Sequence, residues 1–120
     1  MLIGPAKGDN MKHIQLIKNF DSDAASGSLK DMEVSQLFDG AFRKLVEVRL
    51  RNGAVLAKHM AKEPITVFCL SGTGVFRAGM NLQDSHDLRA GTLITLDGGI
   101  EHEVAAEPDL HLIVTKFKNN

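Results

Sequence analysis

Residues 52–72 read N-G-A-V-L-A-K-H-M-A-K-E-P-I-T-V-F-C-L-S-G, and residues 91–102 read G-T-L-I-T-L-D-G-G-I-E-H. Each stretch holds an apolar run bracketed by glycines, with one histidine near an end of the run. Short apolar runs between Gly, Pro, Asn and Asp are typical of β-strands. The two histidines are far apart in the sequence, so they can meet only in a fold that brings distant strands together.

The alternation typical of strands extends upstream of the first stretch. Within residues 42–50 the hydrophobic Val46, Val48 and Leu50 share one face, and Glu47 and Arg49 share the other. Asn52-Gly53 follows, and this pair is the strongest short signal for a β-hairpin. We therefore expect residues 54–59 to return as a strand beside residues 42–50. Residues 32–38 alternate as well and predict an earlier strand before a turn at Asp39-Gly40.

Downstream, residues 65–70 are apolar at nearly every position. Such a run is a strand covered on both faces or a short core helix, and the flanking Pro64 and Gly72 favour the strand. Residues 71–74 (S-G-T-G) predict a turn, and residues 75–78 a weaker strand. Further strands are expected at 92–96, 102–105 and 110–117. The side chains expected to face inward are Val46, Val48, Leu50, Val55, Ala57, Ile65, Val67, Cys69 and Leu93 or Ile94.

Many short strands with closely spaced turns predict an all-β antiparallel barrel or sandwich. A chain of 120 residues fits a single domain. We expect residues 1–10 to form a flexible arm and residues 11–120 one barrel domain, with Met11 as an alternative start. Residues 14–17 are expected to form a short strand or a helical turn, and residues 21–28 and 80–89 polar segments.

Composition excludes several classes of function. The net charge is −1 and no run of like charge stands out, which argues against a nucleic-acid or anionic-membrane partner. No long apolar run is present to span a bilayer. Cys69 is the one cysteine, so no internal disulfide can form and a cytoplasmic location is expected. With no Trp or Tyr, the chain offers only Phe as a stacking platform for a sugar or nucleobase.

In this setting the two stretches resemble the signature motifs of the cupin family. The first cupin motif runs from Gly through five residues to His-x-His, then Glu and a closing Gly; Gly53, His59 and Gly72 match it here. The second runs from Gly through five residues to Pro-x-Gly-x-x-His, matched by Gly91 and His102. The resemblance covers residues 45–117 and implies an all-β antiparallel jelly-roll barrel, also called a double-stranded β-helix.

The departures from the motifs fall on the metal ligands. Cupins with a full metal site use three histidines and one glutamate. Here the second histidine position of the first motif is Ala61, the glutamate position is Ile65, and the proline of the second motif is Asp97. Only His59 and His102 remain, and two imidazoles alone rarely hold a divalent ion against water.

Glu63 offers one way to complete the set. On a continuous strand, Glu63 points to the same side as His59. His59, Glu63 and His102 then form a two-histidine, one-carboxylate set for a divalent transition metal such as Fe, Mn, Ni or Zn. Pro64 predicts a turn here instead, which leaves Glu63 as a solvated loop residue. With Thr66, which lies next to Ile65, these three residues make up the expected pocket site.

Three other candidates have simpler explanations. His111 lies within a strand and is expected to be a structural residue. Residues 85–87 (S-H-D) are adjacent in the chain, so they cannot converge as a catalytic triad. Cys69 lies in the most apolar run and is expected to be an inert buried thiol.

Three functions follow as hypotheses. The first is a binding protein for a small, partly apolar organic molecule, with an incomplete metal site. The second is a metal-dependent enzyme of the dioxygenase or isomerase type, with His59 and His102 as ligands and Glu63 or water completing the shell. The third is a non-catalytic sensor or interaction module. We also expect a homodimer, in which residues 11–17 supply an exchanged strand that covers a sheet edge.

Overall fold

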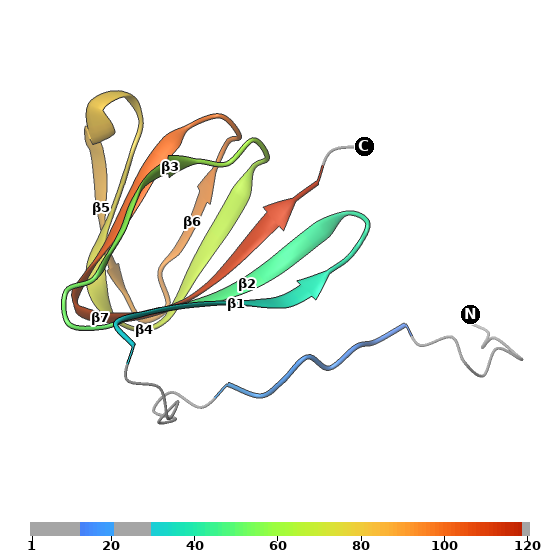
Figure 1. Ribbon diagram of the computed structural model, residues 1–120. Coiled ribbons are helices and arrows are strands. Elements are labelled where there is room, and N and C mark those ends of the chain that lie inside the picture. The colour runs from blue at the N-terminus through green and yellow to red at the C-terminus, as the bar shows by residue number, and fades with distance from the viewer. Residues whose placement is uncertain (1–12, 21–29, 119–120) are drawn as a thin grey trace, which may run out of the picture.

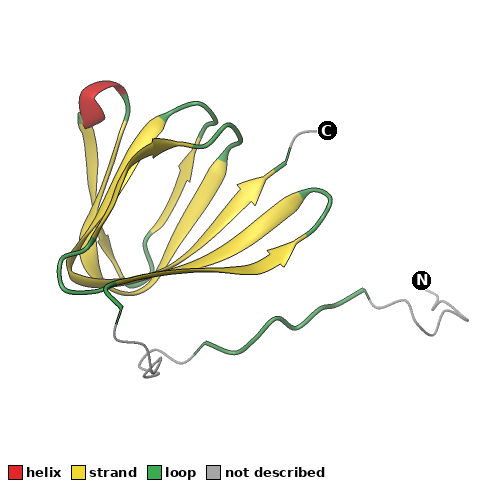
Figure 2. Cartoon of the chain, viewed as in Figure 1, coloured by secondary structure: helices red, strands yellow, loops and turns green. Residues whose placement is uncertain are grey.

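The computed structural model describes residues 13–20 and 30–118, and the expected arm at 1–10, Met11 and the segment 21–28 lie outside these ranges. The described residues form seven antiparallel strands and one short 3-10 turn at Met80–Leu82. The strands are β1 (Met32–Asp39), β2 (Arg43–Leu50), β3 (Val55–Met60), β4 (Ile65–Ala78), β5 (Asp84–Arg89), β6 (Leu93–Leu96) and β7 (Glu101–Phe117). Figure 2 shows how strands account for nearly all of the barrel. The all-β prediction is confirmed.

Two long strands connect the whole barrel. The sheet order is β1-β2-β7-β4-β5, with β3 also paired to β7 and β6 also paired to β4. The first part of β7 pairs with β3 and its last part with β2, while β4 pairs first with β6 and then with β5. Two half-sheets therefore share β4 and β7, and Figure 1 shows the sheet folding over along these two strands.

The bend between the half-sheets falls where a turn was predicted. The prediction of a turn at residues 71–74 is wrong, because β4 runs through this segment with register shifts on both sides of Ser71 and Gly72. A Cβ atom on Gly72 would lie 2.1 Å from the carbonyl oxygen of Asp109, and one on Gly74 would lie 2.3 Å from that of Ala105. The glycines therefore let β4 pass close to β7 at the bend; they do not reverse the chain.

The Asn52-Gly53 pair forms a turn, but not the hairpin that it predicts. Both residues have positive φ, 56° for Asn52 and 74° for Gly53, as a tight Asn-Gly turn requires. β2 pairs with β1 and β7, however, and β3 pairs with β7. The predicted strand at 54–59 exists, yet the turn carries the chain from one half-sheet to the other.

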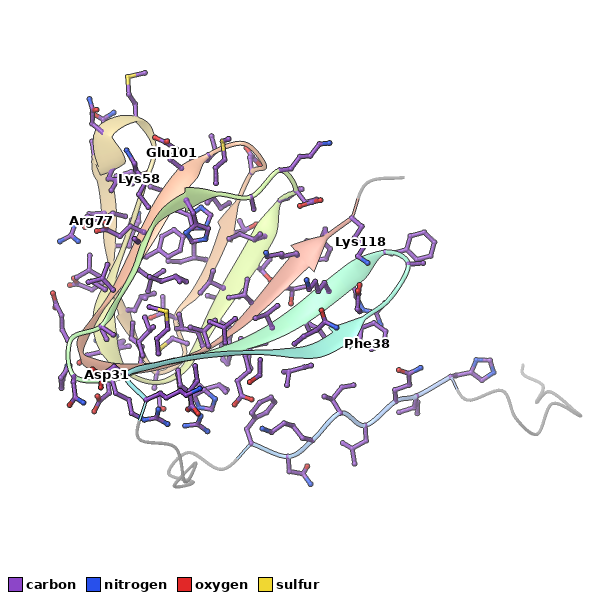
Figure 3. The ribbon with its side chains drawn as sticks, in the orientation of Figure 1. Asp31, Phe38, Lys58, Arg77, Glu101 and Lys118 are labelled. Atoms are coloured by element: carbon purple, nitrogen blue, oxygen red, sulfur yellow. The ribbon has the colours of Figure 1, made fainter. Side chains whose placement is uncertain are left out.

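The core fills the space between the half-sheets, and Figure 3 shows the side chains meeting there. Six of the predicted inward residues are buried in it: Val46, Val48, Leu50, Ile65, Val67 and Cys69. The prediction is wrong for Val55 and Ala57, which are exposed, while Leu56 packs against the core. A register shift between Leu56 and His59 breaks the alternation along β3. In β6 it is Ile94 that packs against the core, and Leu93 is exposed.

Residues 13–20 form no regular element, so the strand or helical turn expected at 14–17 is wrong. Ile14 and Leu16 are 84% and 78% exposed, and Figure 1 shows the segment running outside the barrel beneath β1 and β2. Lys18 and Phe20 tie the segment to the sheet: Lys18 Nζ donates to Glu47 Oε1 over 3.1 Å, and the Phe20 ring meets the ring of His111. Within the described ranges, no helix has the length and apolar character that crossing a membrane requires.

Candidate functional site

The two motif histidines lie side by side in the structure. The pairing of β3 with β7 places His59 directly opposite His102. Their ring centroids are 4.2 Å apart, with an interplanar angle of 62°. Directly opposite residues on antiparallel strands point to the same face. The register shift after Leu56 therefore brings the imidazole of His59 to the inner face beside that of His102, although Ala57, two residues earlier, is exposed.

Backbone carbonyl groups fix the orientation of both rings. His59 Nδ1 lies 2.8 Å from the Ala57 carbonyl oxygen, and His102 Nδ1 lies 3.0 Å from that of Ile100. A carbonyl oxygen only accepts, so each Nδ1 carries the hydrogen and donates it. In the neutral imidazoles Nε2 then holds the lone pair. His102 is also stacked on Phe76, with centroids 5.7 Å apart, and only 3% of it is exposed.

Both histidines line a cavity of about 180 Å³ inside the barrel. Its walls are almost entirely apolar, and its polar side chains are His59, His102 and Lys116. The apolar lining comes from Val34, Val46, Val48, Leu56, Ala61, Ile65, Val67, Phe76, Val104, Leu112 and Val114. His59 is exposed and His102 is buried, so the pair extends from the opening of the cavity into its interior. Apolar walls with a few placed polar groups are what small-molecule sites usually present.

The polar groups of the cavity make its interior basic. Burial lowers the pKa of His102, the hydrogen bond to the Ile100 carbonyl opposes this, and the charges of His59 and Lys116 lower it further. Among the residues that the structure describes, no carboxylate lines the cavity. Lys116 follows Leu112 and Val114 on the inward row of β7, and sequence reasoning missed it. The available signal was the alternation of side chains along residues 110–117: Leu110, Leu112 and Val114 share one face of such a strand, and Lys116 is the next residue on it.

Glu63 and Thr66 do not join the two histidines. Glu63 lies in the bend between β3 and β4, and it is not part of the cavity lining. Thr66 has the opposite parity to the buried Ile65 and Val67, so it faces the other side of β4. No group of three His, Cys, Asp or Glu side chains within residues 13–20 and 30–118 is placed to hold a metal ion. The structure thus brings together two of the four expected site residues.

Solved structures of other proteins share this architecture. A cupin superfamily protein from Desulfitobacterium hafniense matches with a TM-score of 0.67 at 10% identity, covering 73% of this chain and 78% of that chain. An RmlC-like cupin family protein with a double-stranded β-helix fold, from Methanocaldococcus jannaschii, matches with a TM-score of 0.70 at 17% identity, covering 88% of this chain and 93% of that chain. The chain has the cupin fold. The expected jelly-roll barrel is therefore confirmed.

A third similar structure is that of a conserved protein of unknown function from Streptococcus pyogenes, with a TM-score of 0.72 at 18% identity over 91% of this chain and 94% of that chain. No protein-family model and no curated protein matched the sequence. Identities this low show the fold alone. What the cupin barrel does here must be argued from its own residues.

The site of this barrel does not fit a resident transition metal. The Nδ1 hydrogen bonds do leave each Nε2 lone pair free, as in metal-binding histidines. Yet among the described side chains no third ligand stands beside His59 and His102, and the cation of Lys116 lines the same cavity. A positive charge in apolar surroundings opposes the entry of a second one. We derive no chemistry through a metal at this site.

The remaining candidates lie outside the cavity. His111 faces the outer side of β7, where its Nε2 lies 2.6 Å from Glu47 Oε2. Residues 85–87 belong to β5 and not to the polar loop predicted there, and their side chains alternate along the strand. Cys69 is fully buried, and burial raises the pKa of its thiol, which favours the unreactive protonated form.

Proposed function

We propose that this cupin barrel is a binding protein for a small organic molecule, which it holds in the cavity behind His59 without a resident metal. The observation that carries the proposal is the apolar cavity of about 180 Å³ with its few polar groups at and near one opening. An engineered apolar cavity of about 150 Å³ in another protein is large enough for benzene. A ring or a branched chain of about six carbons therefore matches the volume.

Small aromatic molecules should bind in this cavity, and filling it should abolish the binding. Ala61, just after β3, lines the cavity, whereas Ala57 within β3 is exposed and does not. We expect benzyl alcohol to shift the methyl NMR signals of Val67 and Leu112 with an affinity in the millimolar range or tighter, about 4 kcal/mol. Ala61→Phe should eliminate the shifts, because its ring occupies the space, and Ala57→Phe should retain them. Equal binding by both variants would place the ligand elsewhere.

A metal-dependent enzyme of the dioxygenase or isomerase type is the alternative function. Metal analysis distinguishes the two on protein purified without chelator and without nickel affinity resin. The binding proposal expects no stoichiometric transition metal. A stoichiometric Fe, Mn, Ni or Zn that disappears in His59→Ala would establish the enzyme hypothesis in its place.

We further propose that the chain forms a homodimer through its N-terminal segment, which would also suit a sensor or interaction module. Ile14 and Leu16 project from an extended segment that lies outside the barrel, and β1 ends the sheet order with Val34 56% exposed. Exposed apolar side chains beside a strand edge that pairs with no other described strand favour pairing with a second copy. We expect a dimer by light scattering that Leu16→Asp weakens at least tenfold and Gln15→Asp leaves nearly unchanged. A monomer at high concentration would contradict this proposal.

The cytoplasm remains the proposed location. Cys69 is a buried free thiol, which needs no oxidising compartment. We still expect neither nucleic acid nor a membrane as a partner, because the net charge is −1 and no basic run stands out.

A further inference from the structure

We propose that the molecule held in the cavity is a small monocarboxylate, whose carboxylate lies among Lys116, His102 and His59 and whose apolar body fills the space behind them. This inference rests on the proposed binding function and specifies the chemical class of its ligand. It is carried by an unbalanced charge inside an otherwise apolar barrel.

Lys116 is the source of that charge. It lies on the inward row of β7, opposite the buried Ile65 in the register of β4 with β7, and it lines the cavity. Among the described residues, no carboxylate pairs with its ammonium group. Other lysines of the chain do have such partners: Lys18 pairs with Glu47 over 3.1 Å and Lys58 with Glu101 over 4.0 Å. Lys116 is half-buried, and a cation partly withdrawn from water on an apolar face is stabilised by a compensating anion.

The acidic residues nearest to His102 in the sequence are directed outward. Glu101 pairs with Lys58, and Glu103 pairs with Arg77 over 3.4 Å on the outer side of the sheet, where Figure 3 shows Arg77. The charged or titratable side chains of the lining are His59 from β3 and His102 and Lys116 from β7. The lining positions from β1, β2 and β4 carry only apolar side chains. Within the described lining, an anion inside the barrel therefore meets three basic groups and no acidic one.

The charge of the cavity lining favours a ligand with one negative charge over a ligand with two. Burial and the neighbouring positive charges lower the pKa of His102, so at neutral pH its imidazole is uncharged and Lys116 supplies the full positive charge. A monoanion neutralises this charge, whereas a phosphate dianion leaves a net charge in apolar surroundings. The Nδ1 atoms are already engaged with backbone carbonyls, so Nε2 is the atom of each ring available to face the ligand. Protonation at Nε2 turns His102 into a donor towards the carboxylate.

Benzoate and its neutral analogue benzamide test the proposal, because both have nearly the same shape and differ in charge. In calorimetric titrations at pH 6 we expect benzoate to bind about ten times more tightly than benzamide, since charge-assisted hydrogen bonds are the stronger ones. Lys116→Met should remove this preference by weakening benzoate about 10- to 100-fold while leaving benzamide unchanged. Lys58→Met removes an equal charge from the outer face and should change neither affinity.

Proton uptake provides a readout that a merely structural lysine would not affect. A bound anion raises the pKa of His102, so the complex takes up protons and benzoate affinity weakens as the pH rises from about 5 to about 8. The uptake appears as a dependence of the binding enthalpy on the ionisation enthalpy of the buffer, and it should be smaller in His102→Gln. Benzamide should show no such dependence.

The outcomes separate this inference from the function on which it rests. If benzamide and benzyl alcohol bind as tightly as benzoate, or if Lys116→Met retains the preference for benzoate, the carboxylate proposal is overturned and the cavity remains a binding site for neutral molecules. If none of the three probes binds, the binding function fails together with its ligand class.

Discussion

Gly72→Ala should lower the free energy of unfolding by roughly 3–5 kcal/mol. Two costs add at this position. Gly72 has φ of +92°, a backbone conformation that residues with a Cβ rarely adopt. The new Cβ would also lie 2.1 Å from the Asp109 carbonyl oxygen and 2.9 Å from Leu110 Cα, which are backbone atoms that cannot rotate away. Urea unfolding followed by circular dichroism, at one fixed protein concentration, measures the loss.

Two other glycines separate these costs. Gly91 has nearly the same φ, +93°, but open space around the position of its Cβ, so Gly91→Ala should cost only about 1–2 kcal/mol. Gly74 carries no positive φ, yet its Cβ would lie 2.3 Å from the Ala105 carbonyl oxygen, so Gly74→Ala isolates the close contact. The explanation fails if Gly72→Ala is no more destabilising than Gly91→Ala.

The same glycine shows what the sequence could predict about the fold. The spacing from Gly53 through His59 to Gly72 resembled a cupin motif, and the barrel is present as expected. The local run S-G-T-G nevertheless predicted a turn, because glycine and serine next to each other are typical of turns. What keeps this segment in β4 is the distant backbone of β7 at Asp109. Its conformation depends on a non-local contact that no local pattern contains.

The candidate site was predictable where the alternation of side chains holds and not where a bulge or a loop interrupts it. His59 reaches the inner face only because the register of β3 against β7 shifts after Leu56. The simple alternation therefore gave the right direction for His59 and the wrong one for Val55. At Glu63 the strand has already ended, as Pro64 suggested. Lys116 was not predicted because the metal-site motifs contain no position for a lysine.

Outside the barrel, Glu47 and His111 form a buried pair that should contribute substantially to stability. Glu47 is 7% exposed and His111 is 3% exposed. The carboxylate of Glu47 accepts hydrogen bonds from His111 Nε2 over 2.6 Å and from Lys18 Nζ over 3.1 Å, and Arg49 Nη2 lies 3.7 Å away. Burial opposes ionisation of Glu47, but the hydrogen bonds from His111 and Lys18 outweigh it and hold the pKa of Glu47 below its usual value.

Burial also lowers the pKa of His111, by more than the hydrogen bond to Glu47 raises it. At neutral pH the imidazole is therefore uncharged, with its hydrogen on Nε2 pointing to Glu47. Its Nδ1 is buried without a hydrogen-bond partner in the part of the chain that the structure describes. Glu47 thus accepts the one hydrogen bond that this ring makes, from Nε2. It also ties residues 13–20 to the sheet through Lys18.

The depressed pKa values set the direction of the pH dependence. As the pH falls below about 6.5, the unfolded chain binds a proton at its histidine before the folded chain does, so stability is lost from this pH downward. The contribution of the Glu47 carboxylate is present above about pH 4.5 and is lost as the pH falls through its lower folded pKa. His111→Gln should therefore flatten the decline in the free energy of unfolding between about pH 6.5 and 5.

Glu47→Ala should lower the free energy of unfolding at pH 7 by about 2–4 kcal/mol, because it leaves both ring nitrogens of His111 buried without partners. Glu47→Gln retains an acceptor for His111 Nε2 and should cost clearly less, about 1 kcal/mol. Chemical unfolding of the three proteins in parallel measures the difference. If Glu47→Ala and Glu47→Gln both lower the free energy of unfolding only slightly, water reaches His111 in the folded state and the pair contributes little. If both variants lower the free energy of unfolding by the same large amount, the ion pairs of Glu47 with Lys18 and Arg49 contribute more than its hydrogen bond with His111.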